Sequence, residues 1–191
     1  MKEPNIQYSK LRRHRRALDL PGHAHELTFS CYRRYPLLSR DRTRLWFCDS
    51  LSGAAKKWDF AIFAWVIMPE HVHVVLRPRR PDYRMAHILR AIKLPVSRRA
   101  MRYLTDRDSP WLDRLTRIRG SRTERLFWQF GGGYDRNIDN PETLARSIEY
   151  IHSNPVRRGL VESASDWYWS SAADYYRMRK APVPIEMPQS Q

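Results

Sequence analysis

The sequence predicts one mixed α/β (α+β) domain of the ferredoxin-like type, in which an antiparallel sheet is backed by helices. The chain has 191 residues, which is the length of a single domain. Its 42% hydrophobic content and seven Trp exclude wholesale disorder. Strand and helix patterns alternate in the order β-α-β-β-α-β before a final helix, which is the split βαβ order.

A strand and a helix are expected first, after a basic N-terminal arm. Residues 1–22 include the run Lys10–Arg16 and have no apolar period, which predicts a flexible arm. A strand is expected from His25, because HELTFSCYRR is rich in β-branched and aromatic residues. Apolar residues at mixed spacings of three and four predict a helix over Arg40–Trp58, with Asp41 favouring the helix dipole at its start.

Two paired strands and a long helix are expected next. Nine consecutive apolar residues over Phe60–Met68 are too few for a membrane span and predict a central strand buried on both faces. The turn signal Pro69-Glu70 separates it from an antiparallel strand over His71–Pro78. A helical stripe then runs over Asp82–Thr105, and we expect an interruption near Pro95.

The last strand and helix complete the pattern. Arg125–Phe130 (RLFWQF) is expected as the fourth strand, followed by a flexible turn at Gly131–Gly133. Either Asp139 or Asn140 can cap a helix that begins at Pro141, since Pro is favoured in the first helical turn.

The domain is expected over residues 23–171, with 172–191 as a partly disordered C-terminal tail. No apolar run approaches the ~20 residues of a membrane span, and the N-terminus lacks the apolar region of a secretory signal. Cys31 and Cys48 are too few for a disulfide framework, which fits a reducing cytosol. We therefore expect a cytoplasmic protein without a membrane partner, and the basic charge described next makes us expect it to be nucleoid-associated.

The charge balance predicts a polyanionic partner. The net charge is +15, and 29 of the 35 basic residues are Arg after subtraction of six Lys. A GC-rich genome can raise the Arg:Lys ratio but does not explain the net charge. Fifteen basic and five acidic residues over Arg77–Arg125 give that span a net charge of +10. Nucleic acid is the partner that this pattern most often indicates.

His71 and His73 are candidate metal ligands. Alternate residues of a strand face the same side, so both imidazoles project from one face about 7 Å apart. Two neutral imidazoles can converge on one divalent cation. Two histidines alone are equally well explained as partly exposed strand residues that bind no metal.

Tyr150 and Asn154 lie four residues apart and hence on one face of the final helix. The Asn154 carbonyl oxygen is a hard donor, which favours Mg²⁺ or Mn²⁺ over Zn²⁺. Pro155 can bend or stop the helix at Asn154. Tyr150 is a candidate nucleophile if a metal offsets its ordinary pKa near 10, and otherwise a tyrosine packed on the sheet.

Two motifs carry a family resemblance. Histidine, bulky hydrophobe, histidine at 71–73 is the HUH motif, and Tyr-Ile-x-x-Asn-Pro-Val at 150–156 is a tyrosine-helix signature. With these motifs, the chain resembles the REP-associated tyrosine transposases, relatives of the single-tyrosine HUH transposases of bacterial insertion sequences. The resemblance extends from about His25 to Ser171. A WQ-x-x-x-x-x-D segment matches at Trp128, Gln129 and Asp135, whereas Arg136 stands where many relatives have His.

The resemblance implies a metal-dependent single-stranded DNA endonuclease and strand transferase that acts on hairpins called REP palindromes. It implies His71 and His73 as ligands of Mg²⁺ or Mn²⁺, Tyr150 as the nucleophile that forms a 5′-phosphotyrosine, and Asn154 as the third ligand. Insertion-sequence relatives often use Gln at that last position. Relatives act as monomers or as homodimers, and the sequence leaves both states open.

Arginines and aromatic residues are expected to bind the DNA. Single-stranded DNA needs a basic groove and aromatic platforms for its bases. The aromatic candidates in the basic span are Tyr83, Tyr103 and Trp111. The candidate nucleic-acid-binding arginines are Arg12, Arg13, Arg15, Arg16, Arg77, Arg79, Arg80, Arg98 and Arg99.

Three other functions remain open on the sequence. A domesticated transposase can lose cleavage and keep hairpin binding, which gives a catalytically silent DNA-binding protein. A ferredoxin-like sheet with surface aromatics also suits RNA, although no RNP1-like run is present. Replication initiators and relaxases share the HUH motif but are usually larger and carry further ligand histidines.

Overall fold

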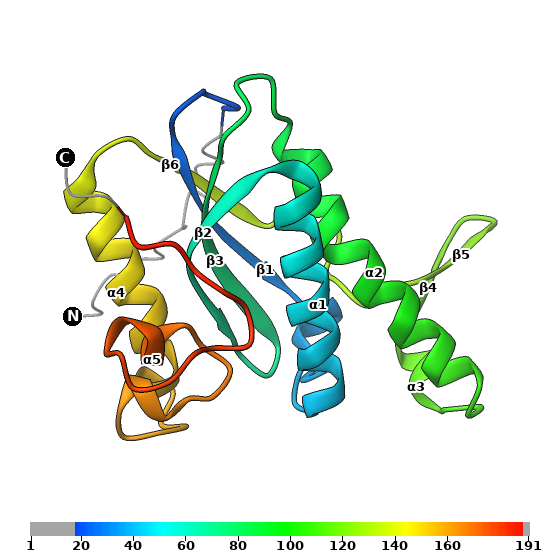
Figure 1. The fold of residues 1–191 in the computed structure, drawn as a ribbon. Coiled ribbons are helices and arrows are strands. Elements are labelled where there is room, and N and C mark those ends of the chain that lie inside the picture. Colours follow the sequence, from blue (N-terminus) through cyan, green and yellow to red (C-terminus); the bar gives the residue numbers. More distant parts are fainter. Residues whose placement is uncertain (1–17, 189–191) are drawn as a thin grey trace, which may run out of the picture.

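A four-stranded antiparallel sheet forms the centre of the protein in the computed structural model, which describes residues 18–188 (Figure 1). Its order is β2-β3-β1-β6, from β1 (Ala24–Ser30), β2 (Phe60–Ile67), β3 (His71–Pro78) and β6 (Tyr134–Ile138). This order and the helices against the sheet confirm the predicted fold class. Most of the expected arm 1–22 lies outside the described residues.

Helices cover both faces of this sheet. Helices α1 (Asp41–Trp58) and α2 (Met85–Thr105) lie on one face, and α4 (Pro141–Arg157) lies on the other with the short α5 (Ala172–Tyr175) beside it (Figure 1). The shorter elements are η1 (Tyr32–Arg34), α3 (Trp111–Arg114), β4 (Thr116–Arg119), β5 (Arg122–Arg125) and η2 (Ala164–Asp166).

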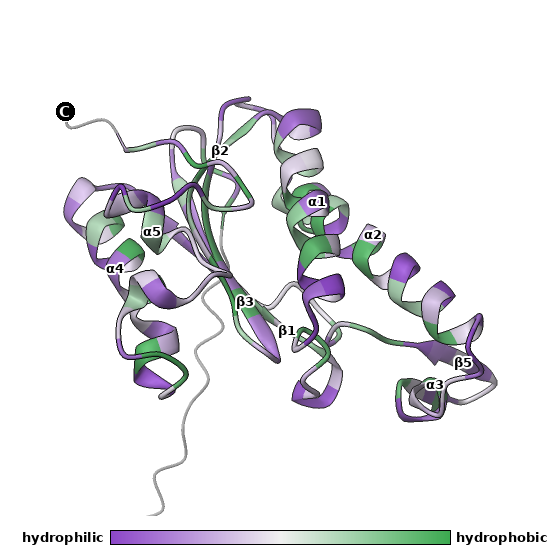
Figure 2. Ribbon diagram, turned by 60° about the horizontal axis from the view of Figure 1, so that its bottom comes forward, coloured by the Kyte–Doolittle hydropathy of each residue, from purple (hydrophilic) through white to green (hydrophobic). Residues whose placement is uncertain are grey.

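The alternation of side chains along β3 determines on which face of the sheet the two histidines lie. Val72 and Val74 belong to the core that α1 and α2 share with the sheet. Val75 belongs to the separate core under α4. Since side chains alternate along a strand, His71 and His73 share the face of Val75 and point toward α4. Figure 2 shows the apolar residues gathered on the strands and on the inner faces of the helices. Among residues 18–188, no helix is both long and apolar enough to cross a membrane.

Strand β2 is buried on both faces as expected, but it lies at an edge of the sheet rather than in its centre. The segment after α4 covers that edge: Ile67 N donates to Trp169 O over 2.8 Å, and Ser171 N donates to Trp65 O over 3.0 Å. A continuous apolar strand is therefore tolerated at an edge because another part of the chain covers it.

The segment 172–188, expected as part of a partly disordered tail, instead packs against β2. Val183 is fully buried, and its carbonyl accepts a hydrogen bond from Trp65 Nε1 at 3.1 Å. Glu186 N donates to Ile62 O over 2.8 Å. The free edge of β2 offers backbone partners that the Pro-rich composition did not reveal. Residues 189–191 lie outside the described part of the chain.

The fourth strand is Tyr134–Ile138, so the prediction of Arg125–Phe130 was wrong. Phe127 and Trp128 are buried as core anchors, and Trp128 makes only an isolated bridge to Cys31. The predicted glycine turn leads into β6. Gly133 has φ +87°, and a Cβ there would lie 2.2 Å from Thr28 O. Only glycine allows the chain to pass β1 this closely.

Helix α2 runs unbroken through Pro95, contrary to the expected interruption. A proline inside a helix leaves the carbonyl four residues earlier, here that of Ala91, without its N–H partner. Ser50 on α1 compensates: its hydroxyl lies 3.2 Å from Ala91 O and 2.7 Å from Ile92 O. The neighbouring helix thus places a donor between these two carbonyls, with its shorter bond to Ile92 O and its longer one to the unpaired Ala91 O.

Candidate functional site

Two buried histidines face each other between the sheet and α4. His71 is 7% exposed and His73 is 5% exposed. Their Nε2 atoms are 3.0 Å apart, and their rings are edge to face with centroids 4.8 Å apart. The strand therefore directs both imidazoles to one point.

The outer nitrogen of each ring has a fixed partner. His71 Nδ1 lies 3.1 Å from Glu70 Oε1, and His73 Nδ1 lies 2.7 Å from Thr28 Oγ1 on the adjacent strand. When each Nδ1–H donates to its oxygen, both Nε2 lone pairs point inward. Such outer hydrogen bonds orient the histidine ligands of metals in proteins.

Glu70 is held by two arginines as well as by His71. Arg34 Nη2 lies 3.2 Å and Arg158 Nη1 lies 3.0 Å from the same oxygen, Oε1. Burial works to raise the pKa of the Glu70 carboxyl, but the neighbouring His71 ring and Arg158 outweigh it and keep that pKa below its ordinary value. The carboxylate thus stays ionised and can accept a hydrogen bond from the Nδ1–H of His71.

Burial keeps both imidazoles neutral. It is the largest cause that lowers the pKa of His71 below its ordinary value. Burial, with the neighbouring His71 and Arg157, lowers the pKa of His73 to about 3. A neutral imidazole is the form that binds a metal.

This donor pair fits a divalent cation. Two neighbouring ligands of an octahedral Mg²⁺ with bonds of about 2.1 Å lie about 3.0 Å apart, and the two Nε2 atoms have that separation. Within residues 18–188, no third His, Cys, Asp or Glu joins the histidines in a metal-binding group. The donor pair therefore suits a cation that takes its other ligands from amide, water or phosphate oxygens.

Tyr150 on α4 lies next to the histidines. Its ring stands edge to face against His73, with centroids 6.0 Å apart. The side chain is 44% exposed, so substrate can reach it. Two helical turns further along α4, the Arg157 guanidinium lies 4.9 Å from the centre of the tyrosine ring. The fold thus brings together a phenol, two imidazoles and a cationic side chain.

Asn154 is buried on the same helix, and its amide nitrogen is already used. Its Nδ2 donates to Tyr150 O at 2.8 Å and to Ile151 O at 3.3 Å. Ile151 O is the carbonyl that Pro155 deprives of an N–H partner, so α4 continues to Arg157 instead of stopping. These bonds leave Oδ1 without a hydrogen-bond partner among the described residues.

A polar network fixes α4 to the sheet one turn before Tyr150. Glu26 Oε2 on β1 accepts hydrogen bonds from Ser147 Oγ at 3.0 Å and from Arg136 Nη2 at 2.6 Å. Arg136 on β6 also lies 2.7 Å from Ser147 Oγ. Arg136, the departure from the family pattern, therefore has a structural role here.

The other matched residues also hold the fold together. Asp135 Oδ1 lies 2.8 Å from His25 Nδ1, which joins β6 to β1. Trp128 Nε1 donates to Lys93 O on α2 at 2.9 Å. Gln129 Oε1 accepts from Arg33 N at 3.2 Å.

The predicted DNA-binding arginines do not gather around the histidines. Arg77 lies near the far end of β3, about 20 Å along the strand from His71, and Arg79 and Arg80 follow directly after the strand. Arg79 is engaged in ion pairs with Asp59 and Glu186. Arg98 and Arg99 are exposed on α2, on the opposite face of the sheet. The four arginines Arg12, Arg13, Arg15 and Arg16 lie outside the described residues.

The arginines that border the site are Arg34, Arg157 and Arg158, which the sequence analysis did not select. It also did not select Glu70 and Thr28, the two partners of the histidine rings. The only signal in the sequence was the position of Glu70 directly before the HUH motif.

The three aromatic side chains expected to stack on DNA bases make contacts with other residues of the protein. Tyr83 is 6% exposed and its hydroxyl lies 2.7 Å from His25 Nε2, so it is not a platform. Tyr103 is sandwiched between Arg42 and Arg107, whose guanidinium groups lie 3.6 and 3.9 Å from its ring centre. Trp111 packs edge to face against Tyr35.

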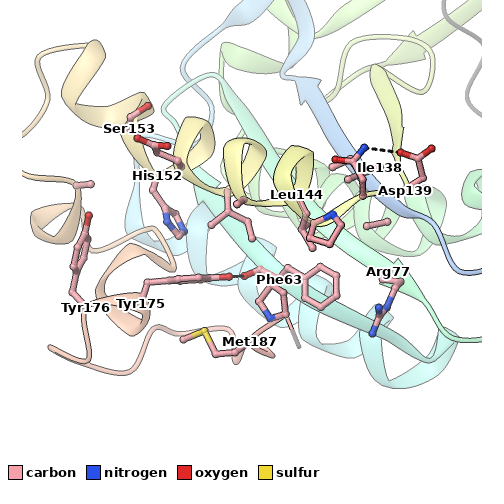
Figure 3. A pocket seen from close by; sticks show the side chains of 18 of the residues that line it. Phe63, Arg77, Ile138, Asp139, Leu144, His152, Ser153, Tyr175, Tyr176 and Met187 are labelled. Carbon is pink, nitrogen blue, oxygen red and sulfur yellow. Dashed lines mark hydrogen bonds between the residues drawn. The ribbon is translucent and has the colours of Figure 1, made fainter. Parts of the chain in front are cut away.

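A cavity of 880 Å³ lies along another side of α4 (Figure 3). Its lining includes Phe63, Arg77, His152, Tyr175 and Met187. The two histidines of the HUH motif, Tyr150 and Asn154 do not belong to the lining. The cavity is therefore separate from the histidine–tyrosine site.

Comparison with known proteins places the chain in a family. The family model described as "Transposase IS200 like" matches residues 22–131. This match covers more than half of the chain and includes both histidines, but it ends before α4. The protein belongs to the IS200-like transposase family.

Within that family, it is similar to REP-associated tyrosine transposases. A predicted member from Haemophilus influenzae is 23% identical over 156 residues, which cover 78% of this chain and 82% of the relative. One from Escherichia coli K12 is 27% identical over 112 residues, which cover 59% of this chain and 54% of the relative. The solved structure of a REP-associated tyrosine transposase bound to a REP hairpin shares the fold, with a TM-score of 0.65, 20% identity, and coverage of 92% of this chain and 93% of that one.

Proposed function

We propose that this protein cleaves and rejoins single-stranded DNA beside a hairpin, with Tyr150 as the nucleophile and Mg²⁺ or Mn²⁺ held by His71 and His73. The observation that carries the proposal is the position of Tyr150 edge-on to a buried, inward-facing histidine pair. The similarity to REP-associated tyrosine transposases, one of them solved with a REP hairpin, supports hairpin DNA as the substrate.

The reaction is a transesterification. Tyr150 Oη forms a bond to the phosphorus as the bond from phosphorus to the 3′ oxygen breaks. The phenolic proton leaves the tyrosine and the departing oxygen takes up a proton, which gives a free 3′-OH and a 5′-phosphotyrosine. The reverse attack by a 3′-OH reseals the strand and restores the phenol, so no nucleotide cofactor is consumed.

Each residue of the site has a separate role in the proposed reaction. His71 and His73 would hold the cation through Nε2, and the unused Oδ1 of Asn154 is the proposed third protein donor. A bound divalent cation supplies neutralisation of charge on the phosphate. Glu70 and Thr28 fix the imidazole orientations. Arg157 places a positive charge against Tyr150 as the phenol loses its proton.

Covalent capture tests the proposal. The wild type, incubated with a labelled single-stranded hairpin oligonucleotide and Mn²⁺, should give a DNA–protein adduct that survives denaturing electrophoresis. The adduct should disappear with EDTA and in Tyr150→Phe. Tyr176→Phe is the matched control, because Tyr176 is also exposed, at 63%, and lies outside the site.

Two other outcomes of this experiment would contradict the proposal. Tight hairpin binding without an adduct in any metal would contradict the nuclease proposal and leave a DNA-binding protein derived from a transposase. An adduct that persists in Tyr150→Phe would assign the attack to another residue.

A further inference from the structure

A small β-ribbon projects from the body of the protein. Strands β4 and β5 pair antiparallel and project past the flank of α2, away from the central sheet (Figure 1). Gly120 and Ser121 form the turn between them, and Gly120 has φ +58°. Figure 2 shows β5 as strongly hydrophilic. The sequence pattern did not predict this ribbon.

The base of the ribbon is anchored while its tip is free. Leu126 N donates to Leu115 O at 2.8 Å, and Leu115 is fully buried. By contrast, Arg119 and Arg122 are exposed, and Ile118 has 75% of its surface in solvent. The ribbon is thus carried by the core, but its outer half is open to solvent.

One face of the ribbon carries an unbalanced charge. Arg117 lies opposite Glu124 and forms an ion pair with it. The next pair toward the tip on that face is Arg119 opposite Arg122. Neither of these two arginines has an acidic partner among the described residues. Like charges directly opposite in an antiparallel pair are destabilising, so this arrangement favours an external anion.

The dimensions of the ribbon fit duplex DNA. A two-stranded ribbon can enter the major groove, which is about 12 Å wide and about 8.5 Å deep. Four residues per strand extend about 13 Å at 3.3 Å per residue, enough to bring the tip into the groove. Arginine is suited to both phosphate oxygens and guanine edges.

We propose that the β4–β5 ribbon binds the double-stranded stem of a DNA hairpin, with Arg119 and Arg122 contacting its backbone and groove. The inference rests on the proposed function for its substrate and deepens it. The ribbon reads the duplex stem, while the Tyr150 site acts on the adjoining single strand.

Two matched oligonucleotides test the inference. One contains a stem–loop beside the cleavage site, and the other has the same single strand without a stem. Fluorescence anisotropy should show that the double variant R119A/R122A binds the stem–loop at least about tenfold more weakly. Its affinity for the stem-less strand should stay within about twofold of wild type. The slope of log K against log salt for the stem–loop should fall by about 2, which is about one unit for each phosphate that the variant can no longer neutralise.

The control removes the same charge elsewhere. R40A/R177A changes two exposed arginines whose side chains form no hydrogen bond or ion pair within residues 18–188, and it should bind both DNAs like the wild type apart from a small general decrease. A melting temperature of R119A/R122A that is equal to or above that of the wild type establishes that the ribbon variant is folded, since the substitution removes two opposed like charges. An equal decrease on both oligonucleotides, or no decrease on either, would overturn the stem-binding role.

The covalent assay separates this proposal from the nuclease proposal. R119A/R122A should still form the Tyr150-dependent adduct on the stem-less strand at high DNA concentration. If neither the wild type nor the variant forms an adduct, but R119A/R122A loses affinity for the stem–loop and not for the stem-less strand, the nuclease proposal fails and the ribbon proposal stands.

Discussion

Glu26 on β1 and Ser147 on α4 are joined by a hydrogen bond of 3.0 Å, although they are 121 residues apart in the sequence. Ser147 lies one helical turn before Tyr150, so this bond fixes the position of the tyrosine along the sheet. Arg136 reinforces it from β6 by bonding to both partners. A three-residue network therefore aligns α4, the helix that carries Tyr150, with the sheet that carries the histidines.

Removal of Glu26 should destabilise the protein and slow cleavage together. Glu26→Ala leaves the Arg136 guanidinium and the Ser147 hydroxyl without their shared acceptor, which we expect to cost about 2–3 kcal/mol in the free energy of unfolding. Urea denaturation measures this cost. Glu162→Ala, at an exposed position, should cost less than about 0.5 kcal/mol. An equal cost for the two variants would contradict the network.

Glu70 should control metal binding without being a ligand. Glu70→Gln keeps the shape of the side chain but weakens the hydrogen bond that orients His71. Removal of such an outer partner typically lowers metal affinity about 10–100-fold. Titration calorimetry with Mn²⁺ measures the change, and Glu162→Gln is the control. A normal affinity in Glu70→Gln would show that His71 is oriented by other contacts.

Asn154 should have two separable roles. Asn154→Asp keeps a side-chain oxygen for the cation but removes the Nδ2 donor to Ile151 O, the carbonyl that Pro155 leaves unpaired. We expect metal-dependent cleavage to survive in this variant, with a decrease in stability of about 1 kcal/mol. Asn154→Ala should lose both properties. Full Mn²⁺ affinity in Asn154→Ala would exclude the residue as a ligand.

Ser50 should matter more for stability when Pro95 is present than when it is absent, although its hydroxyl also bonds to Ile92 O. Ser50→Ala removes the donor that serves Ala91 O, and we expect a cost of about 1–2 kcal/mol in urea unfolding. In the Pro95→Ala background, the new N–H at position 95 can bond to that carbonyl, so the same substitution should cost less. Additive effects of the two substitutions would refute the compensation.

The cysteines should make stability fall at alkaline pH. Burial raises the pKa of the Cys48 thiol from 9.0 to about 12 and raises that of Cys31 further. Above pH ~9 the unfolded chain therefore releases protons that the folded chain retains, and the free energy of unfolding decreases as pH rises. Between about pH 7 and 10, the free energy of unfolding of Cys48→Ala should decrease less steeply with pH than that of the wild type.

The same burial should protect both thiols from alkylation. Iodoacetamide at about pH 8 should label folded wild type at least about 100-fold more slowly than the unfolded chain, since the thiolate is the reactive form. Ser39→Cys adds an exposed thiol as the positive control. Rapid labelling of Cys31 or Cys48 in the folded protein would contradict their burial.

Much of the fold could be predicted from patterns formed by residues that are close together in the sequence. The apolar run of β2 and the alternation of β3 identify strands because their side chains have one or two buried faces. The Asn140 cap of α4 follows from local chemistry: its side chain accepts from Thr143 N at 2.8 Å. These features depend on residues close in the sequence, which is why they could be predicted.

The missed elements depend on distant contacts. The β6 sequence YDRNI has few apolar residues, and its pairing with β1 rests on backbone bonds and on Asp135 and Arg136 contacts. The ribbon sequence is mostly charged and gains its form from the turn at Gly120. At the site, the histidine and tyrosine motifs were visible, whereas Thr28 and Arg34 meet them only through the fold.

The cover over the β2 edge has a consequence for biosynthesis. A growing chain that has completed α4 already contains all four strands of the central sheet, but the residues that bond to β2 from 169 to 186 come later. Until they arrive, a fully apolar strand presents an open edge to the cell, and such edges pair with other chains. A chain truncated in this interval would keep that edge open, so we expect it to aggregate more readily than the full chain.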